Sequence, residues 1–186
     1  MKTICDLCKK LYNPIRLELL KRAYTALDGG VNVGFAQDDS GLGISGTSQY
    51  LKQLEDLGLI RRERAGRYVN YLADWSHAPS DIGEIAALLS ARFKANGEVE
   101  SLLPFFGVMM NPLRARVVHY LAQGGDGTKT HLIERFKQSK RTFDRDLKPA
   151  RDAGLLDMDD DDATAGRYIY LAPSDPIALR IIELIR

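Results

Sequence analysis

The amino-acid sequence predicts a mainly α-helical protein with small β-hairpins, built from two consecutive copies of one module. Three observations predict this class. Short motifs recur in the same order, apolar residues follow helical spacing in both halves, and in each half two β-type segments flank a glycine turn. With 186 residues, of which 45% are hydrophobic, the chain can bury the cores of two small units.

The repeat consists of five motif pairs whose members lie 94 to 100 residues apart and keep their order, which chance matches would not do. The pairs are Asn13-Pro14-Ile15-Arg16 with Asn111-Pro112-Leu113-Arg114, Gly58-Leu59-Ile60 with Gly154-Leu155-Leu156, Gly66-Arg67-Tyr68 with Gly166-Arg167-Tyr168, Tyr71-Leu72-Ala73 with Tyr170-Leu171-Ala172, and Ala78-Pro79-Ser80-Asp81 with Ala172-Pro173-Ser174-Asp175. The repeat predicts a first module over residues 1–76, a trailing helix and connector over 77–106, a second module over 107–172 and a C-terminal helix over 173–186. Residues 96–107, with two glycines and a proline, are the expected connector.

Each module is predicted to begin with a helix after its Asn-Pro pair. Asparagine suits the N-cap, proline suits the first turn, and apolar residues follow at helical spacing. The apolar positions are Ile15, Leu19, Leu20 and Ala23 in the first copy and Leu113, Val117, Val118 and Leu121 in the second. A glycine pair, Gly29-Gly30 or Gly124-Gly125, then ends the helix.

Two short helices follow in each copy, and the second of them ends at a glycine stop signal, Gly58 or Gly154. The apolar residues ahead of that glycine are Leu51, Leu54 and Leu57 in the first copy and Leu147, Ala150 and Ala153 in the second. Glycines 41, 43 and 46 predict a turn before the second short helix of the first copy. Pro149 lies inside the second short helix of the other copy, removes a backbone hydrogen bond and predicts a kink or an early helix end.

Two short strands are expected after each stop glycine. They cover residues 59–63 and 67–73 in the first copy and 155–158 and 167–172 in the second. Three helices followed by a hairpin are the layout of a winged helix-turn-helix, in which the hairpin is the wing. The sequence therefore predicts two tandem winged helix-turn-helix modules, each followed by an additional helix.

The additional helix of each copy begins at the Ala-Pro-Ser-Asp motif, where serine or aspartate suits the N-cap. Its apolar stripe is formed by Ile82, Ile85, Ala86, Leu89 and Phe93 in the first copy and by Ile177, Ile181, Leu184 and Ile185 in the second. A stripe on a short helix needs a partner surface. The segments Ile82–Phe93 and Ile177–Ile185 therefore predict packing between the two copies or self-association of two chains.

The runs NPIRLELL, SQYLKQLEDLGLI and GRYVNYLA resemble the arsenical-repressor-like (ArsR) family of winged-helix transcriptional regulators, and NPLRARVV, FDRDLKPARDAGLL and GRYIYLA repeat the resemblance. It covers nearly the whole chain. Members of that family are usually homodimeric repressors with one module per chain, so the resemblance implies a single-chain pseudo-dimer. The family's metal sensors carry a cysteine pair or histidine and carboxylate ligands at the recognition or terminal helix, and this sequence has neither pattern there.

In a helix-turn-helix the second short helix, the recognition helix, enters the major groove, while basic residues around it and on the wing meet phosphates. With Leu51 and Leu54 inward, helical spacing turns polar residues outward. The predicted DNA-binding residues of the first copy are Ser45, Ser48, Gln49 and Lys52 on the helix and Arg61, Arg62, Arg64 and Arg67 on the wing. Those of the second copy are Lys137, Lys140, Arg141, Arg145 and Lys148, all expected on the helix, and base specificity is expected from Ser48, Gln49, Arg141 and Arg145.

These features favour a sequence-specific transcriptional regulator that binds double-stranded DNA and acts by occupying a promoter site. An alternative for the basic residues is a solvated face without a ligand. An alternative for the whole chain is a tandem winged-helix protein–protein interaction module, as in subunits of bacterial condensin-like complexes. Such a module should expose apolar rather than basic faces.

Composition excludes several other classes. The 26 basic and 25 acidic residues give a net charge of +1, so charge arguments have to be local. The sequence has no run of 18 apolar residues and no apolar signal-peptide core, which predicts a cytoplasmic protein without membrane contact. It also lacks a phosphate-binding loop, a nucleophile elbow, an HExxH motif and a carboxylate pair, so neither an enzyme nor a bound cofactor is expected.

Cys5 and Cys8 form one CxxC, which is half of a tetrahedral zinc site, and the histidines at 77, 119 and 131 are dispersed. Buried structural thiols are favoured, with a thiol-reactive sensor and a metal site as alternatives and no metal expected.

The second wing carries five aspartates, Asp157 and Asp159 to Asp162, which would repel a phosphate within a Debye length of about 8 to 10 Å. A solvated loop, a docking strip for basic residues and a divalent-cation site are the alternatives for them.

Overall fold

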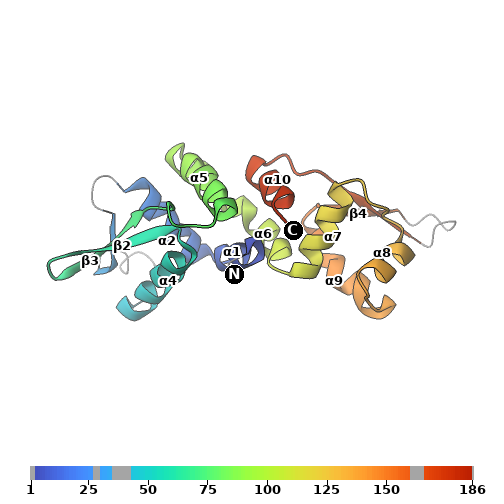
Figure 1. The fold of residues 1–186 in the computed structure, drawn as a ribbon, viewed down its shortest axis with the longest axis horizontal. Coiled ribbons are helices and arrows are strands. Elements are labelled where there is room, and N and C mark those ends of the chain that lie inside the picture. Colours follow the sequence, from blue (N-terminus) through green and yellow to red (C-terminus); the bar gives the residue numbers. More distant parts are fainter. Residues whose placement is uncertain (1–2, 27–29, 35–42, 160–165, 186) are drawn as a thin grey trace. The chain divides into compact units, whose positions relative to one another are not determined.

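The computed structural model describes residues 3–26, 30–34, 43–159 and 166–185, and the chain divides into two compact units, Met1–Leu103 and Pro104–Arg186. Both units consist of helices with a small antiparallel sheet (Figure 1). The predicted fold class, mainly α with small β elements, is confirmed at this level. The unit boundary falls inside the segment 96–107 that was expected to connect the two copies.

Among the described residues of unit 1 are four complete α-helices, a three-stranded sheet and a short 3-10 turn. In chain order these are α1 (Ile4–Leu11), α2 (Pro14–Thr25), β1 (Val31–Asn32), α4 (Ile44–Leu57), β2 (Ile60–Ala65), β3 (Tyr68–Ala73), α5 (Ser80–Lys94) and the 3-10 turn η1 (Glu100–Leu102). The strands lie in the order β1-β3-β2, all antiparallel. In Figure 1 the β2–β3 hairpin projects from the rest of the unit.

Unit 2 has the same order of elements. These are α6 (Leu103–Met109), α7 (Pro112–Ala122), α8 (Lys129–Arg135), α9 (Lys140–Asp152), β4 (Leu156–Asp159), β5 (Arg167–Tyr170) and α10 (Pro176–Glu183). A single bridge between Thr128 and Arg167 takes the place that β1 has in unit 1. Residues 35–42 of unit 1, which include Gly41, lie outside the described residues.

The Asn-Pro pairs begin α2 and α7 as predicted. The Asn13 side chain accepts a hydrogen bond from the backbone N–H of Arg16, and Asn111 accepts from the N–H groups of Leu113 and Arg114. Along both helices, the first buried side chain lies two residues later than predicted. Leu17 and Ala115 are buried, while Ile15 and Leu113 are partly exposed, because the first turn of each helix lies outside the core.

The arginine that ends each Asn-Pro motif joins its helix to the preceding one. Arg16 Nε donates to the Lys10 carbonyl at 2.7 Å, and Arg114 Nε donates to the Val108 carbonyl at 3.3 Å. The preceding helices α1 and α6 therefore correspond to each other. Their buried positions match, with Leu7, Cys8 and Leu11 in α1 and Phe105, Phe106 and Met109 in α6. The second copy thus begins one helix earlier than predicted, at α6. Much of the expected connector is helical and buried because it forms the start of this helix.

Two glycines end α4 and α9 as predicted. Gly58 has φ 82° and Gly154 has φ 68°, the left-handed conformation in which only glycine is unstrained. The next residue in each unit donates back to the helix, Leu59 to the Leu54 carbonyl and Leu155 to the Ala150 carbonyl. An early end of α9 at Pro149 is wrong, because the helix continues to Asp152.

Strand pairing matches the residues of the two hairpins differently from the repeated sequence motifs. Ile60 and Leu156 each follow their stop glycine by two residues; Ile60 pairs with Ala73, and Leu156 pairs with Tyr170. The repeated sequence motifs are therefore displaced along the second strand by two or three residues, although the hairpin of unit 2 is longer by only one residue. The corresponding residues are Ala73 with Tyr170 and Tyr71 with Tyr168.

Both hairpins also differ slightly in their bounds from the prediction. Strands β2 and β4 begin one residue later than expected, and β5 ends two residues earlier, at Tyr170. Gly43 is the N-cap of α4 and Gly46 lies within its first turn, so Gly46 is not part of the preceding turn.

The trailing helices pack within their own units, α5 on α2 and α1, and α10 on α7. All five stripe residues of α5 are buried; in α10 the buried set includes Ile182, while Leu184 is partly exposed. Asp175 caps α10 through the N–H groups of Ile177 and Ala178. The expected serine or aspartate cap of α5 is wrong, because its N-cap is Pro79.

Candidate nucleic-acid interface

Helix α4 separates a buried face from a polar exposed face. Its buried side chains are Thr47, Leu51, Leu54 and Leu57, which follow the helical period. Of the predicted DNA-binding residues, Ser45, Gln49 and Lys52 are exposed, and Ser48 is partly exposed at the edge. An apolar residue joins them, since Ile44 in the first turn keeps 59% of its surface exposed.

Helix α9 has the same arrangement with a different exposed chemistry. Phe143, Leu147 and Ala150 are buried, and Lys140, Arg141, Arg145 and Lys148 are exposed. Lys148 forms an ion pair with Asp152 at 2.8 Å, and Arg145 Nε lies 3.7 Å from Asp146. Lys137 does not lie on the helix as predicted. It is in the turn before α9, with φ 51°.

Counting back from the stop glycines places the exposed residues of the two helices at matched positions. Each pair lies the same number of residues before Gly58 or Gly154. The pairs are Ile44 with Lys140, Ser45 with Arg141, Ser48 with Asp144, Gln49 with Arg145 and Lys52 with Lys148. One helix face is therefore nearly neutral and the other strongly basic, at the same places of the repeated structure.

The hairpin of each unit is bonded to this helix by a buried tyrosine. Tyr168 donates to Asp144 Oδ1 at 2.7 Å, and Lys129 forms an ion pair with the same carboxylate. In unit 1 the Ser48 side chain lies within hydrogen-bonding reach of Tyr71. The contact between tyrosine and helix positions the helix against the hairpin in both units. In unit 1 this contact involves the Ser48 hydroxyl, which was expected to contact bases.

The ionisation of these groups follows their surroundings. Burial of Asp144 opposes its charged form, but the hydrogen bonds from Lys129 and Tyr168 outweigh it and lower the pKa of the carboxyl. Burial, with Glu55 nearby, raises the pKa of Tyr71. Asp144 is therefore an anion at neutral pH, and its charge lies on the edge of the basic face of α9.

The four wing arginines of unit 1 are all exposed but differ in their partners. Arg61 forms ion pairs with Glu63 and Asp74, each at 3.1 Å, and Arg62 lies 3.9 Å from Glu55. The two arginines beside the turn, Arg64 and Arg67, have no ion-pair partner among the residues that the structure describes.

These two arginines make only neutral contacts. Arg64 Nε donates to the Gly66 carbonyl at 3.4 Å, and Arg67 lies over the exposed Tyr68 ring at 5.0 Å and donates to its hydroxyl. The charge available to a ligand is thus concentrated at the tip of the β2–β3 hairpin.

The corresponding hairpin of unit 2 is acidic on its first strand. Asp157 and Asp159 are exposed, and Asp160, Asp161 and Asp162 lie outside the described residues. Arg167 on the second strand approaches Asp126 at 3.6 Å. The exposed side of β5 carries Arg167 and the apolar Ile169, and Leu171, directly after the strand, is exposed as well.

The cysteine pair lies in the core of unit 1. Cys8 is buried and Cys5 partly buried; burial raises the pKa of both thiols, that of Cys8 strongly. The position of Cys8 is occupied by Phe106 in unit 2, which favours a packing role. In the part of the chain that the structure describes, no three His, Cys, Asp or Glu side chains come together as metal ligands.

The dispersed histidines of unit 2 have structural partners. His119 Nδ1 is 2.7 Å from the Ile182 carbonyl, which links α7 to α10. His131 Nε2 is 3.0 Å from the Tyr120 hydroxyl.

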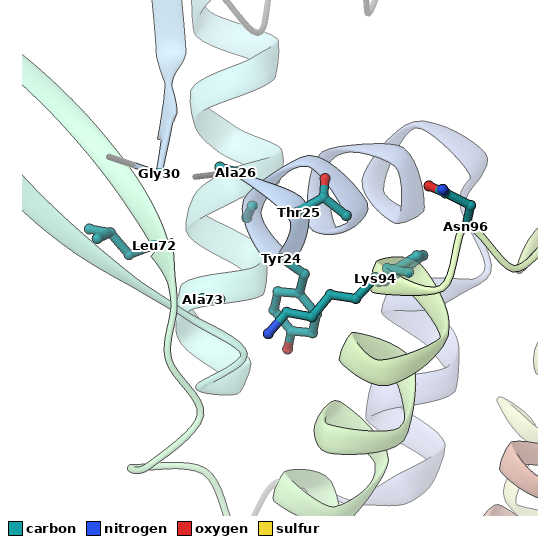
Figure 2. A pocket seen from close by; sticks show the side chains of 10 residues that line it. Tyr24, Thr25, Ala26, Gly30, Leu72, Ala73, Lys94 and Asn96 are labelled. Atoms are coloured by element: carbon teal, nitrogen blue, oxygen red, sulfur yellow. The ribbon is translucent and has the colours of Figure 1, made fainter. Parts of the chain in front are cut away.

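Unit 1 also has a hollow of about 690 Å³ between the C-terminal ends of α2 and α5 and strand β3 (Figure 2). Most of its lining is apolar and Lys94 is its charged group; the Tyr24 hydroxyl is already bonded to the Leu59 carbonyl at 3.1 Å. The lining residues are Ala23, Tyr24, Thr25, Ala26, Gly30, Leu72, Ala73, Phe93, Lys94 and Asn96. None of the predicted DNA-binding residues is among them, so the hollow is separate from the polar face.

Sequence reasoning missed Asp144, Tyr168 and Ile44. The position of Asp144, one residue after a buried one and three before the next, is a signal that its side chain lies at the edge of the buried face. The exposed Ile44 had no such signal, because an isoleucine in a first helical turn is as often buried.

Comparisons with protein-family models, with curated proteins and with solved structures give no match for this chain. Among the described residues, no helix has the length and apolar character needed to cross a bilayer.

Proposed function

We propose that each unit is a winged helix-turn-helix module and that the chain is a sequence-specific transcriptional regulator that binds double-stranded DNA. The recognition helices are α4 and α9, and the hairpins are the wings. One observation carries the proposal. Both units expose polar or basic side chains at matched positions of the helix that precedes the hairpin, while the opposite face of that helix is buried.

The order of elements supports the module assignment. In unit 1 a helix, a short strand, helix α4 and a hairpin follow one another, with the short strand β1 pairing to β3, the second strand of the hairpin. In unit 2, α8 and α9 are joined by the four-residue turn 136–139, a length typical of a helix-turn-helix. The resemblance of the sequence to the ArsR family agrees with this assignment, and it implies a single-chain pseudo-dimer.

The distribution of charge supports phosphate binding, although the net charge is only +1. In unit 1 the cations are at the hairpin tip, where Arg64 and Arg67 lack acidic partners among the described residues. In unit 2 they lie on and before α9, where Lys137, Lys140 and Arg141 likewise lack acidic partners in the described ranges. Within the described part of the chain, each unit therefore presents cations without acidic partners on its recognition helix, on the turn before it or on the hairpin after it, which are the elements that would contact the phosphates flanking a major groove.

The mechanism is occupancy of a promoter site. Recognition-helix side chains contact base edges in the major groove, and the cations around them contact phosphates and set the position of the protein on the duplex. Tyr71 and Tyr168 hold each helix against its hairpin, so that both contact surfaces keep one relative geometry.

Fluorescence anisotropy with labelled genomic duplex fragments tests this function. If each unit contacts roughly three phosphates, the binding constant falls with salt with a log–log slope on the order of −5. The test protein is the full chain, and the competitor is an excess of unlabelled random duplex, which separates specific from general binding. A flat salt response, or no binding at low salt, would overturn the proposal.

A second candidate, a protein-interaction module, is favoured by one observation in unit 2. Ile169 of β5 and Leu171 just after it expose 43% and 41% of their surfaces, and β5 pairs with the acidic strand β4. Pull-down from cell extract, with and without nuclease, separates the two candidates. Partners that remain after nuclease treatment, and that the substitutions Ile169→Ser and Leu171→Ser release, support the interaction module.

A further inference from the structure

The matched helix positions carry an inference about the DNA site itself, which rests on the proposed function. We infer that the two units recognise unlike half-sites, so that the operator is asymmetric. Unit 1 contacts an A·T-containing half-site through Gln49 and Ile44 of α4, and unit 2 contacts a guanine-containing half-site through Arg141 and Arg145 of α9.

The exposed side chains of α4 and α9 occupy equivalent positions in the two units. Gln49 and Arg145 lie the same number of residues before their stop glycines, and both follow a residue that contacts the hairpin tyrosine. Ser45 and Arg141 are one helical turn earlier on the same exposed face. Each pair therefore presents different chemistry from the same place in the module.

The side chains at these matched positions prefer different bases. Arginine donates two parallel hydrogen bonds to the O6 and N7 atoms of guanine, and glutamine bonds in the same bidentate way to N6 and N7 of adenine. An apolar side chain favours the thymine methyl group. Ile44, 59% exposed in the first turn of α4, is such a side chain at the position that Lys140 has in unit 2.

The side chains proposed to contact bases are exposed and at most weakly held by neighbouring residues. The side chain of Arg145 is 75% exposed and 3.7 Å from Asp146, a weak ion pair that a base can replace. Arg141 has no ion-pair partner among the described residues, and neither Gln49 nor Ile44 is held by a hydrogen bond there. In contrast, Ser48 and Asp144 are engaged by Tyr71 and Tyr168 and do not contribute to the difference.

The phosphate contacts are divided unequally as well. Among the described residues, unit 1 has two cations without acidic partners on its hairpin and Lys52 on α4, whereas unit 2 has Lys137, Lys140 and Arg141 on α9 and the turn before it, with acidic residues on its hairpin. Unit 2 is therefore expected to contact phosphates at the edge of the major groove, and unit 1 to reach further along the duplex with its hairpin. Two identical half-sites would not satisfy both arrangements.

The experiment is selection of bound duplexes from a randomised library with the full chain, followed by sequencing. The expected result is a motif of two unlike halves, one with a guanine and one with A·T pairs. Arg145→Gln should remove the guanine preference from one half by about tenfold, and Gln49→Arg should introduce guanine into the other half. The double variant Gln49→Arg with Ile44→Lys should make the two halves more alike.

Lys52→Gln and Lys148→Gln are the matched controls, because these lysines are exposed at equivalent positions one turn further on. They should weaken binding to all sequences without altering the motif. A palindromic motif, or binding without any sequence preference, overturns the asymmetric operator while DNA binding stands. Absence of binding to every duplex overturns the proposed function itself. Circular dichroism of each variant confirms that the surface substitutions leave the fold intact.

Discussion

Tyr168 and Asp144 join strand β5 to helix α9 through a 2.7 Å hydrogen bond from the phenol to the carboxylate. The tyrosine is buried, and the carboxylate also forms an ion pair with Lys129 of α8. Three elements of unit 2 therefore meet at one anionic acceptor. Unit 1 makes the corresponding connection between Tyr71 and Ser48, in which the partner is neutral.

Tyr168→Phe should lower the free energy of unfolding of unit 2 by about 1 kcal/mol, because it removes a hydrogen bond to a charged acceptor that stays bonded to Lys129. Hydrogen exchange followed by mass spectrometry of α9 and β5 measures the effect. Tyr71→Phe is the matched control, with the same atom removed from a neutral pair in unit 1. Slower exchange, or no change, in the Tyr168→Phe variant would contradict the assigned bond.

Asp144 also predicts a pH dependence. Its folded pKa is lowered, so its contribution to stability is fully present above the unfolded value of about 3.9 and is lost as pH falls through the folded value. Asp144→Asn should therefore be less stable than the parent chain near neutral pH, and the difference should shrink below pH of about 4. Urea unfolding across this range is the measurement. A difference that does not depend on pH would show that the charge of Asp144 is not involved.

Replacing each of the two stop glycines by alanine should lower the free energy of unfolding by unequal amounts. Alanine at Gly154 meets only the strain of the left-handed backbone, about 1 kcal/mol, because no atom lies within 4 Å of the added Cβ. At Gly58 the added Cβ would also lie 3.1 Å from Ala78 Cα. Gly58→Ala should therefore destabilise unit 1 more than Gly154→Ala destabilises unit 2. Hydrogen exchange of α4 and α9 compares them, and equal losses would refute the contribution of Ala78.

The parts of the fold that the sequence predicts are those set by local chemistry. Asn13 and Asn111 cap helices, Gly58 and Gly154 end them, and the intervening apolar periods give the buried faces. The sheet register was not predictable from the repeated sequence motifs, because strand pairing lengthens the second hairpin by one residue, whereas the motifs lie two or three residues further along the chain.

Long-range contacts explain the other omissions. Strand β1 has two residues and exists through its pairing with β3, so no local period indicates it. Helix α6 was hidden by Pro104 and Gly107, which local reasoning assigns to a connector, whereas Phe105 and Phe106 bury it. The exposure of the predicted residues on α4 and α9 follows from the buried stripe of each helix, but the approach of Tyr71 to Ser48 depends on the tertiary structure.

The N-caps predict a unit-specific loss of stability. Asn13→Ala and Asn111→Ala should each cost about 1 kcal/mol, because the first N–H groups of α2 and α7 lose their acceptor. The chain has one tryptophan, Trp75 in unit 1, which lies 5.2 Å from the Tyr24 ring. Its fluorescence should therefore report the unfolding of unit 1 and respond to Asn13→Ala, with Asn13→Asp as the control that keeps the acceptor. A larger shift with Asn111→Ala would be inconsistent with separate units.

The hairpin arginines of unit 1 predict which charges bind phosphate. Arg64 and Arg67 lack acidic partners among the described residues, whereas Arg61 is paired with Glu63 and Asp74. Replacing Arg64 and Arg67 by alanine should reduce the steepness of the salt dependence of DNA binding by about 2 in log–log slope. Arg61→Ala is the control, and it should change the slope by less, because its charge is already compensated. Anisotropy titrations at several salt concentrations measure both variants, and an equal effect of Arg61→Ala would exclude the hairpin tip as the principal phosphate contact.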